Sequence, residues 1–203
     1  MMTKISKSSH VILDELQKSL GKPYEIATKV ILKYEIDLQS VAWYGLTELR
    51  DVTTHIANAV NSNDENEAIL EIKYANEHIR RAALETLHEY ASDLFDELKP
   101  RLEGSTLKYR LLMLAPPNPE RVRELKERIQ SRLLEARSSR GTDWIKSVDN
   151  FYEAITDLKT LSNEAPPISE VRWRIFTIII GILTIISSVT AIKWIYDLIK
   201  IFV

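Results

Sequence analysis

The chain has 203 residues, contains no cysteine and carries a formal net charge of −2 at pH 7. The lack of cysteine excludes disulfides and thiolate metal ligands, and the balanced charge is unlike that of a strongly cationic nucleic-acid-binding protein. Residues 171–203 hold four basic residues and one acidic residue, a net +3, whereas the rest of the chain holds 23 basic and 28 acidic residues, a net −5. We therefore expect no DNA partner.

Helical periodicity extends through most of the chain, which contains only five glycines. A short helix is predicted after Ser8 and Ser9, ending at Gly21 and Pro23. Long helices are then predicted over residues 24–60 and 65–98, separated by a turn-forming run and ended by Pro100. The apolar positions expected to face the core are Ile12, Leu13, Leu16 and Leu20, then Ile31, Tyr34, Leu38, Val41, Leu49, Val52, Ile56 and Val60, then Ile72, Ala75, Ile79, Ala83, Leu87, Tyr90 and Leu94.

Residues 99–118 predict an irregular segment with one or two helical turns. Asn118 and Pro119 supply cap and first-turn chemistry for a helix to about residue 137. The interleaved Glu and Arg residues of this helix indicate a solvated face, with ion pairs between residues four apart.

Thr142 predicts the cap of a further helix, to about residue 158. Its expected inward side chains are Trp144, Ile145, Val148, Phe151, Ile155 and Leu158. Four long helices joined by short to moderate loops predict an all-α, up-and-down four-helix bundle over residues 1–161.

Residues 175–192 contain no charged residue. As a helix this run spans roughly 27 Å, close to a bilayer core of about 30 Å. We predict a linker at 162–170, a transmembrane helix with its flanks at 171–192, and an amphipathic interfacial tail at 193–203 that bends or tilts. The side chains expected at the membrane interface are Arg172, Trp173, Arg174, Lys193, Trp194 and Tyr196.

One face of the predicted membrane helix carries the small residues Thr177, Gly181, Thr184 and Ser188. Such a stripe lets membrane helices approach closely, so we predict a contact between copies in a homo-oligomer. The alternative is that hydroxyl residues are merely tolerated in lipid. Because the first residues lack the apolar core of a signal peptide, we expect a tail-anchored, single-pass protein with its soluble domain in the cytosol.

The sequence has no phosphate-binding glycine loop, nucleophile elbow or HExxH motif. His78 and His88 would lie about 15 Å apart on a helix, so no metal site and no cofactor are predicted. Two polar groups remain. The first is Arg50, Asp51 and His55, and the second is His78, Arg81, Glu85 and His88, which share one helix face with Tyr74.

The runs WYGLTELRDVTTHIANAV and NEAILEIKYANEHIRRAALETLHEYA resemble the HEPN superfamily of small helical bundles, over roughly residues 24–100. Many members are ribonucleases whose signature is an Arg and a His with four to six residues between them. Arg50, Asp51 and His55 match that signature, and Arg81 with His88 matches it more loosely. The resemblance implies metal-independent RNA cleavage, with His as acid/base and Arg on the phosphorane.

Geometry adds a condition to this resemblance. Residues five apart on a helix point about 140° away from each other, so Arg50 and His55 cannot meet unaided. HEPN enzymes typically combine two motifs in a dimer. The alternative is that both residues make ordinary surface or interhelix hydrogen bonds.

Three function classes follow. The favoured one is a non-enzymatic, membrane-anchored effector or accessory protein that oligomerises, as a pore or only an anchor, similar to HEPN-like proteins of prokaryotic RNA-targeting CRISPR or antiphage defence. The second is a membrane-tethered HEPN ribonuclease, and the third is a tail-anchored adaptor. The acidic soluble part disfavours RNA binding. The expected partners are the lipid bilayer of a prokaryotic inner membrane, further copies of the chain, and an RNA or an RNA-guided effector protein.

Overall fold

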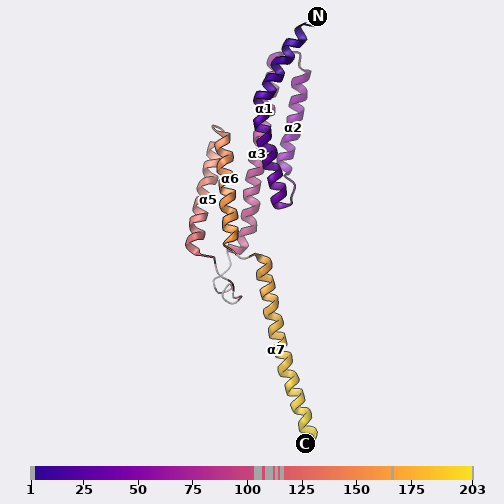
Figure 1. Ribbon diagram of the computed structural model, residues 1–203, viewed down its shortest axis with the longest axis vertical. Helices are drawn as coiled ribbons and strands as arrows, with labels where there is room; N and C mark the ends of the chain where they lie inside the picture. Colours follow the sequence, from indigo (N-terminus) through magenta and orange to yellow (C-terminus); the bar gives the residue numbers. More distant parts are fainter. Residues whose placement is uncertain are drawn as a thin grey trace. The chain divides into compact units, whose positions relative to one another are not determined.

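In the computed structural model the chain is all-helical (Figure 1). The structure describes residues 3–102, 107, 112, 114, 117–165 and 167–202, without the side chains of 3–11, 168 and 192–202. Within these residues there are six helices and no strand, which confirms the all-α class. The helices are α1 (Thr3–Leu38), α2 (Trp43–Asn61), α3 (Glu65–Leu102), α5 (Pro119–Ser139), α6 (Trp144–Asn163) and α7 (Ile168–Phe202).

Helix α1 continues through Gly21 and Pro23, so the predicted break there is wrong. Pro23 is buried, and it lies three residues after the buried Leu20 and four before the buried Ala27. These spacings place Pro23 on the core side of one helix. Packing on both sides of Pro23 therefore outweighs the loss of one backbone hydrogen bond at the proline.

The predicted helix over residues 24–60 is instead two helices, because the chain turns between Leu38 and Trp43. Gln39 has φ 52°, the left-handed conformation that ends many helices. After the turn, the buried residues of α2 are Gly45, Val52 and Ala59. The predicted inward positions Val41 and Val60 are wrong, since they are 41% and 64% exposed.

Helix α3 follows the sequence prediction most closely. Asp64 Oδ1 accepts the Asn66 N–H at 2.9 Å and caps the start of the helix. All seven predicted core positions of this helix are buried. The helix continues through Pro100 to Leu102, so its predicted end at residue 98 is wrong.

The caps of α5 and α6 differ in how well the sequence predicted them. Asn118 Oδ1 accepts the backbone N–H groups of Glu120 and Arg121 at 3.0 and 3.3 Å, which confirms the predicted cap. At α6 the predicted cap Thr142 is wrong, because Asp143 Oδ1 accepts the Lys146 N–H at 3.0 Å. A carboxylate is a strong acceptor for these N–H groups and suits the positive end of the helix.

The chain divides into two compact units, and residues 1–96 with 124–159 form the first. A polar network that includes the buried Tyr34 and Tyr90 links three of its helices. Tyr34 donates to Asp93 Oδ2 at 2.8 Å, Tyr90 donates to Asp37, and Lys159 Nζ lies 2.5 Å from Asp37 Oδ2. Burial raises the pKa of both tyrosines to about 12, and the bonds from Lys159 and Tyr90 lower the pKa of Asp37 to about 2.

Helices α5 and α6 are joined by arginine pairs that the sequence did not predict. Arg128 Nη2 lies 2.8 Å from Asp157 Oδ1, and Arg132 Nη1 lies 2.5 Å from Asp157 Oδ2. Asp157 is 6% exposed. The sequence expectation of partners four residues apart missed these bonds to α6, although Arg128 remains 45% exposed as expected for a solvated face. The two arginines instead neutralise a buried carboxylate across the helix contact.

The second unit comprises residues 97–123 and 160–203. Arg101 Nη1 donates to Ser162 Oγ at 3.0 Å and joins the end of α3 to the end of α6. Val171 packs against the buried Leu112 and Leu114. α7 is one continuous helix to Phe202, and the interfacial role of residues 193–203 stays a prediction.

Candidate functional site

A group of ionisable side chains lies between α2 and α3. The rings of His55 on α2 and His78 on α3 are stacked, with centroids 4.9 Å apart and 28° between their planes. His55 Nδ1 lies 2.8 Å from Glu71 Oε2 of α3, and His78 Nδ1 lies 2.7 Å from Glu48 Oε2 of α2. Each histidine thus meets a carboxylate of the other helix. We call these four residues the histidine seam.

Arg81 lies at one end of the histidine seam. Its Nη2 atom is 2.8 Å from His78 Nδ1 and 3.0 Å from His78 Nε2, and its Nε is 3.3 Å from Glu48 Oε2. A guanidinium only donates and a carboxylate only accepts. One tautomer of His78 suits both the Glu48 carboxylate and the Arg81 guanidinium. It carries its proton on Nδ1, donates to Glu48 and accepts from Arg81 through Nε2.

The other end of the histidine seam is held by Glu71. Hydrogen bonds from His55 and Asn58 lower the pKa of the Glu71 carboxyl. The ionised carboxylate favours a proton on His55 Nδ1. The side chains of His55 and His78 are 23% and 17% exposed, so their edges remain accessible to solvent.

Arg50 and Asp51, the other residues of the predicted signature, do not take part in the histidine seam. Arg50 is 73% exposed, and its Nη2 lies 3.1 Å from Asp51 Oδ1. Arg50 also lines an apolar groove of about 1010 Å³ between α1 and α2, together with Leu20 and Leu49. Within one chain, the structure therefore brings His55 to His78 and leaves Arg50 apart from both.

The second predicted group is divided between two sets of partners. His78 and Arg81 contact α2, as described above. His88 Nε2 instead lies 2.9 Å from Arg137 Nη2, and Arg140 pairs with Glu85. His88 and Glu85 thus face the end of α5 and the turn after it, and one helix face serves two separate contacts.

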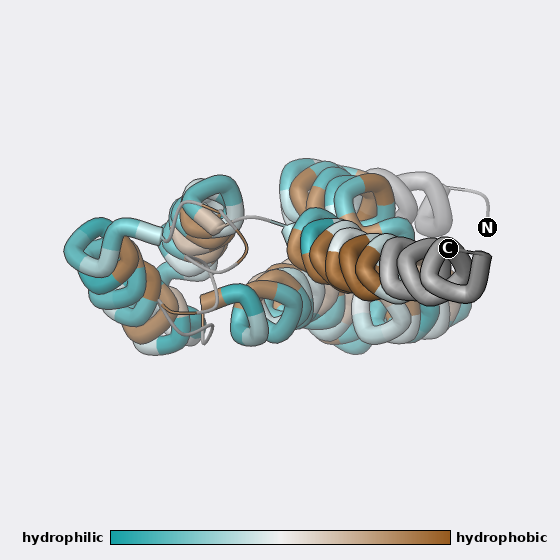
Figure 2. Tube along the Cα trace, turned by 90° about the horizontal axis from the view of Figure 1, so that it is seen from below, coloured by the Kyte–Doolittle hydropathy of each residue, from teal (hydrophilic) through white to brown (hydrophobic). Residues whose placement is uncertain are grey.

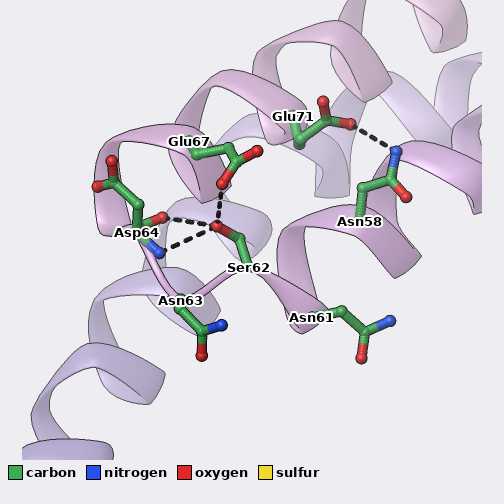
Figure 3. A pocket seen from close by; sticks show the side chains of 7 residues that line it. All are labelled: Asn58, Asn61, Ser62, Asn63, Asp64, Glu67 and Glu71. Carbon is green, nitrogen blue, oxygen red and sulfur yellow. Dashed lines mark hydrogen bonds between the residues drawn. The ribbon is translucent and has the colours of Figure 1, made fainter.

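A polar pocket of about 480 Å³ lies at the turn between α2 and α3 (Figure 3). The Ser62 hydroxyl donates to Glu67 Oε2 at 2.7 Å and also bonds to the backbone of Asp64. The pocket also holds Glu71 and Asn58. No group of three or more possible metal ligands occurs in the described part of the chain.

Helix α7 exposes a long run of apolar side chains, from Trp173 to Val189. Residues 169–191 are long and apolar enough to cross a membrane, and Figure 2 shows the hydrophobic colouring of this helix. None of the apolar window is buried. The hydroxyls of Thr177, Thr184 and Ser188 each donate to the backbone carbonyl four residues earlier, at 2.8–3.0 Å. The space around Gly181 is open, since an added Cβ would have no neighbour within 4 Å.

The predicted interface residues are described on the N-terminal side of α7 only. Trp173 is 66% exposed and stacks on Phe176 with ring centroids 5.7 Å apart. Arg172 is exposed, and Arg174 Nη2 is 3.9 Å from Glu170 Oε1. Lys193, Trp194 and Tyr196 lie in the helix, but their side chains are outside the described set.

The chain matches no protein family, no curated protein and no solved structure.

Proposed function

We propose that this protein is a membrane-anchored effector or accessory protein in which a helical bundle is tethered to a bilayer by α7. The observation that carries this proposal is the unburied apolar window at residues 169–191. In water such a surface would attract other apolar surfaces, whereas a bilayer covers it along its whole length. The tryptophan and arginines at its N-terminal flank fit the headgroup region.

Self-assembly through α7 is the second part of the proposal. One membrane helix cannot enclose a channel, so a pore needs several chains. The hydroxyls of Thr177, Thr184 and Ser188 are bonded within their own helix, so close backbone packing at Gly181 would hold the contact.

The biological setting in this proposal rests on the HEPN-like resemblance of residues 24–100. In this proposal the bundle lies on the cytosolic side of a prokaryotic inner membrane and acts in antiphage defence. An RNA or an RNA-guided effector protein would then be the activating partner, and the four-helix HEPN-like arrangement is part of the same proposal.

The test compares two added leucines in the full-length protein. Gly181→Leu fills the open space on the small-residue face, and Thr190→Leu adds bulk on the far side of the same helix. Leucine favours insertion, so both variants should stay in membranes. We expect Gly181→Leu to lower the light-scattering mass in detergent and membrane leakage in cells, and Thr190→Leu to change neither.

An unchanged mass and unchanged leakage for Gly181→Leu would mean that α7 does not assemble through this face. A wild-type protein that is monomeric in detergent and causes no membrane leakage would favour a tail-anchored adaptor.

RNA cleavage is the second candidate, and the stacked pair His55 and His78 beside Arg81 favours it. One imidazole could take the proton of the ribose 2′-hydroxyl while the other protonates the leaving 5′-oxygen, with Arg81 near the phosphate. Glu48 and Glu71 add negative charge at the same place, which opposes RNA binding. For this reason cleavage ranks below the anchored effector.

Alanine variants separate the two possible ribonuclease sites in the purified oligomer. A site within one chain loses cleavage with His55→Ala and His78→Ala and retains it with Arg50→Ala. A site built from two signature motifs loses cleavage with Arg50→Ala and His55→Ala and retains it with His78→Ala. No cleavage by the wild type in the presence of its activator would reject both.

A further inference from the structure

The turn between α1 and α2 exposes large apolar side chains that the proposed function does not use. Ile36 is 73%, Trp43 69% and Tyr44 66% exposed, and Val41 lies between them at 41%. These four residues fall within nine positions of the sequence, at the end of α1, in the turn and at the start of α2. We call them the aromatic tip.

Three of the four residues of the aromatic tip, Val41, Trp43 and Tyr44, lie in a run of the chain without charge, whereas Ile36 lies between Glu35 and Asp37. Between Asp37 and Glu48 there is no charged residue, although 28% of the whole chain is charged. Most protein surfaces use charged side chains to remain soluble, and an uncharged turn with exposed Trp and Tyr is unusual. Indole and phenol rings have an apolar body and one polar atom, a combination that favours the headgroup region of bilayers.

The connection to α7 limits how far a bilayer can be from the first unit. Lys159, the last residue of that unit, contacts Asp37 at 2.5 Å, four residues before Val41. From Lys159 the chain follows the end of α6, a short connection and the first turns of α7 before it reaches Ile175. With these helical parts the contour length is roughly 35 Å, an upper limit that holds for any orientation of the two units.

We propose that the aromatic tip inserts into the headgroup region of the same bilayer that α7 spans, as a second membrane contact of the chain. Trp43 and Tyr44 would lie at the depth of the lipid carbonyls, with Val41 against the upper acyl chains and Ile36, between Glu35 and Asp37, on the water side. The uncharged turn lets these side chains enter without carrying an ion out of water. This inference rests on the proposed membrane anchorage by α7.

The absence of cysteine makes a depth measurement straightforward, because one introduced cysteine takes one spin label. Tyr44→Cys reports on the aromatic tip, and Trp43→Cys is an independent second position. Val60→Cys is the matched control, since Val60 is 64% exposed at the other end of α2. Leu183→Cys reports on the middle of α7. Each full-length variant is reconstituted in vesicles of phosphatidylcholine and phosphatidylglycerol, and accessibility to oxygen and to a nickel chelate is measured.

We expect the ratio of oxygen to nickel accessibility to be several-fold higher at positions 43 and 44 than at position 60, and highest at position 183. Equal ratios at 43, 44 and 60, with position 183 in lipid, would overturn the tip proposal and leave the anchor intact. Nickel accessibility at position 183 would overturn the anchor itself. Spin–spin broadening at position 44 that disappears on dilution with unlabelled protein would identify a second copy as the occupant and also overturn the lipid assignment.

Discussion

Helices α3 and α7 have similar lengths, 38 and 35 residues, but opposite surroundings. In α3 buried apolar residues such as Ile72, Ile79 and Leu87 recur every three or four positions, and charged residues occupy the other faces. In α7 the residues from 175 to 191 carry no charge, and their side chains are all exposed. Apolar content and periodicity both distinguish α3, whose apolar residues recur on a buried face, from α7, whose apolar residues surround the helix.

Polar side chains differ between the two helices in the same way. In α3 they bond to other helices, as in the pairs His78–Glu48 and Tyr90–Asp37. In α7 the hydroxyls bond to their own backbone, as Thr184 does to the carbonyl of Ile180. Cross-helix bonds fix the register of the bundle, whereas bonds within α7 satisfy its hydroxyl groups without a neighbouring helix.

Matched leucine truncations should give the largest contrast between α3 and α7. Leu87 is 0% exposed, whereas Leu183 is 53% exposed. Leu87→Ala leaves a cavity and should lower the free energy of unfolding of the bundle by about 2–5 kcal/mol. Leu183→Ala should leave it unchanged. Denaturant unfolding of the detergent-solubilised full-length protein, followed by near-UV circular dichroism, measures both, and equal losses would refute the contrast.

The two glycines Gly45 and Gly181 sharpen the same comparison. A Cβ on Gly45 would clash with Thr86 Oγ1 and lie 3.0 Å from Ile31, whereas one on Gly181 would meet nothing within 4 Å. Gly45→Ala should therefore destabilise the bundle by about 1–3 kcal/mol through overpacking. Gly181→Ala should have no effect on bundle unfolding. A stabilising effect of Gly45→Ala would show that α2 can move away from α1 and α3 at little cost.

Acid should weaken the bundle through Asp37. Its pKa is about 2 in the folded protein against an ordinary value of 3.8, so ionised Asp37 stabilises the fold fully above about pH 4. This stabilisation, up to about 2 kcal/mol, is lost as the pH falls from about 4 to 2. Asp37→Asn should lower the free energy of unfolding at pH 7 and should reduce its dependence on pH between about pH 4 and pH 2.

Asp14→Asn is the control for Asp37→Asn, because Asp14 pairs with Lys18 on the exposed face of α1. Unfolding free energies measured between pH 7 and pH 2 should differ from wild type for Asp37→Asn only. If the free energy of unfolding falls equally with pH in the wild type and in Asp37→Asn, then Lys159 and Tyr90 do not stabilise the ionised Asp37 carboxylate in solution.

The smallest expected effect is at the turn that divides α1 from α2. Gln39 has φ 52°, a conformation that glycine adopts without steric cost. Gln39→Gly should stabilise the bundle by up to about 1 kcal/mol, and Gln39→Val should destabilise it. Thermal unfolding in detergent distinguishes them. The reverse order would mean that residue 39 is not left-handed in solution.

The sequence predicted the parts of the fold in which one periodic pattern dominates. The α3 core and the apolar α7 are of this kind, and the Asn118 cap was predicted from its residue type. It failed where two local signals conflict with packing. Gly21 and Pro23 indicate a stop, but Pro23 occupies a core position, and no residue with strong turn preference marks the real break at Gln39.

The histidine seam could have been found in the sequence from a repeated spacing. Glu48 and His55 are seven residues apart, and so are Glu71 and His78. On antiparallel neighbours this spacing brings each Glu to the His of the other helix. Tyr34 with Asp37 and Tyr90 with Asp93 form a second repeated pair, three residues apart. A search for a signature within one helix misses both repeats, because each repeat is recognised only when the sequences of two helices are compared.

The membrane anchor is tested most directly by washing membranes from cells that make the full-length protein with alkaline carbonate. We predict that the full-length chain stays in the pellet and that a variant lacking residues 171–203 is recovered as a folded, soluble protein. Release of the full-length chain into the carbonate supernatant would contradict a membrane-spanning α7.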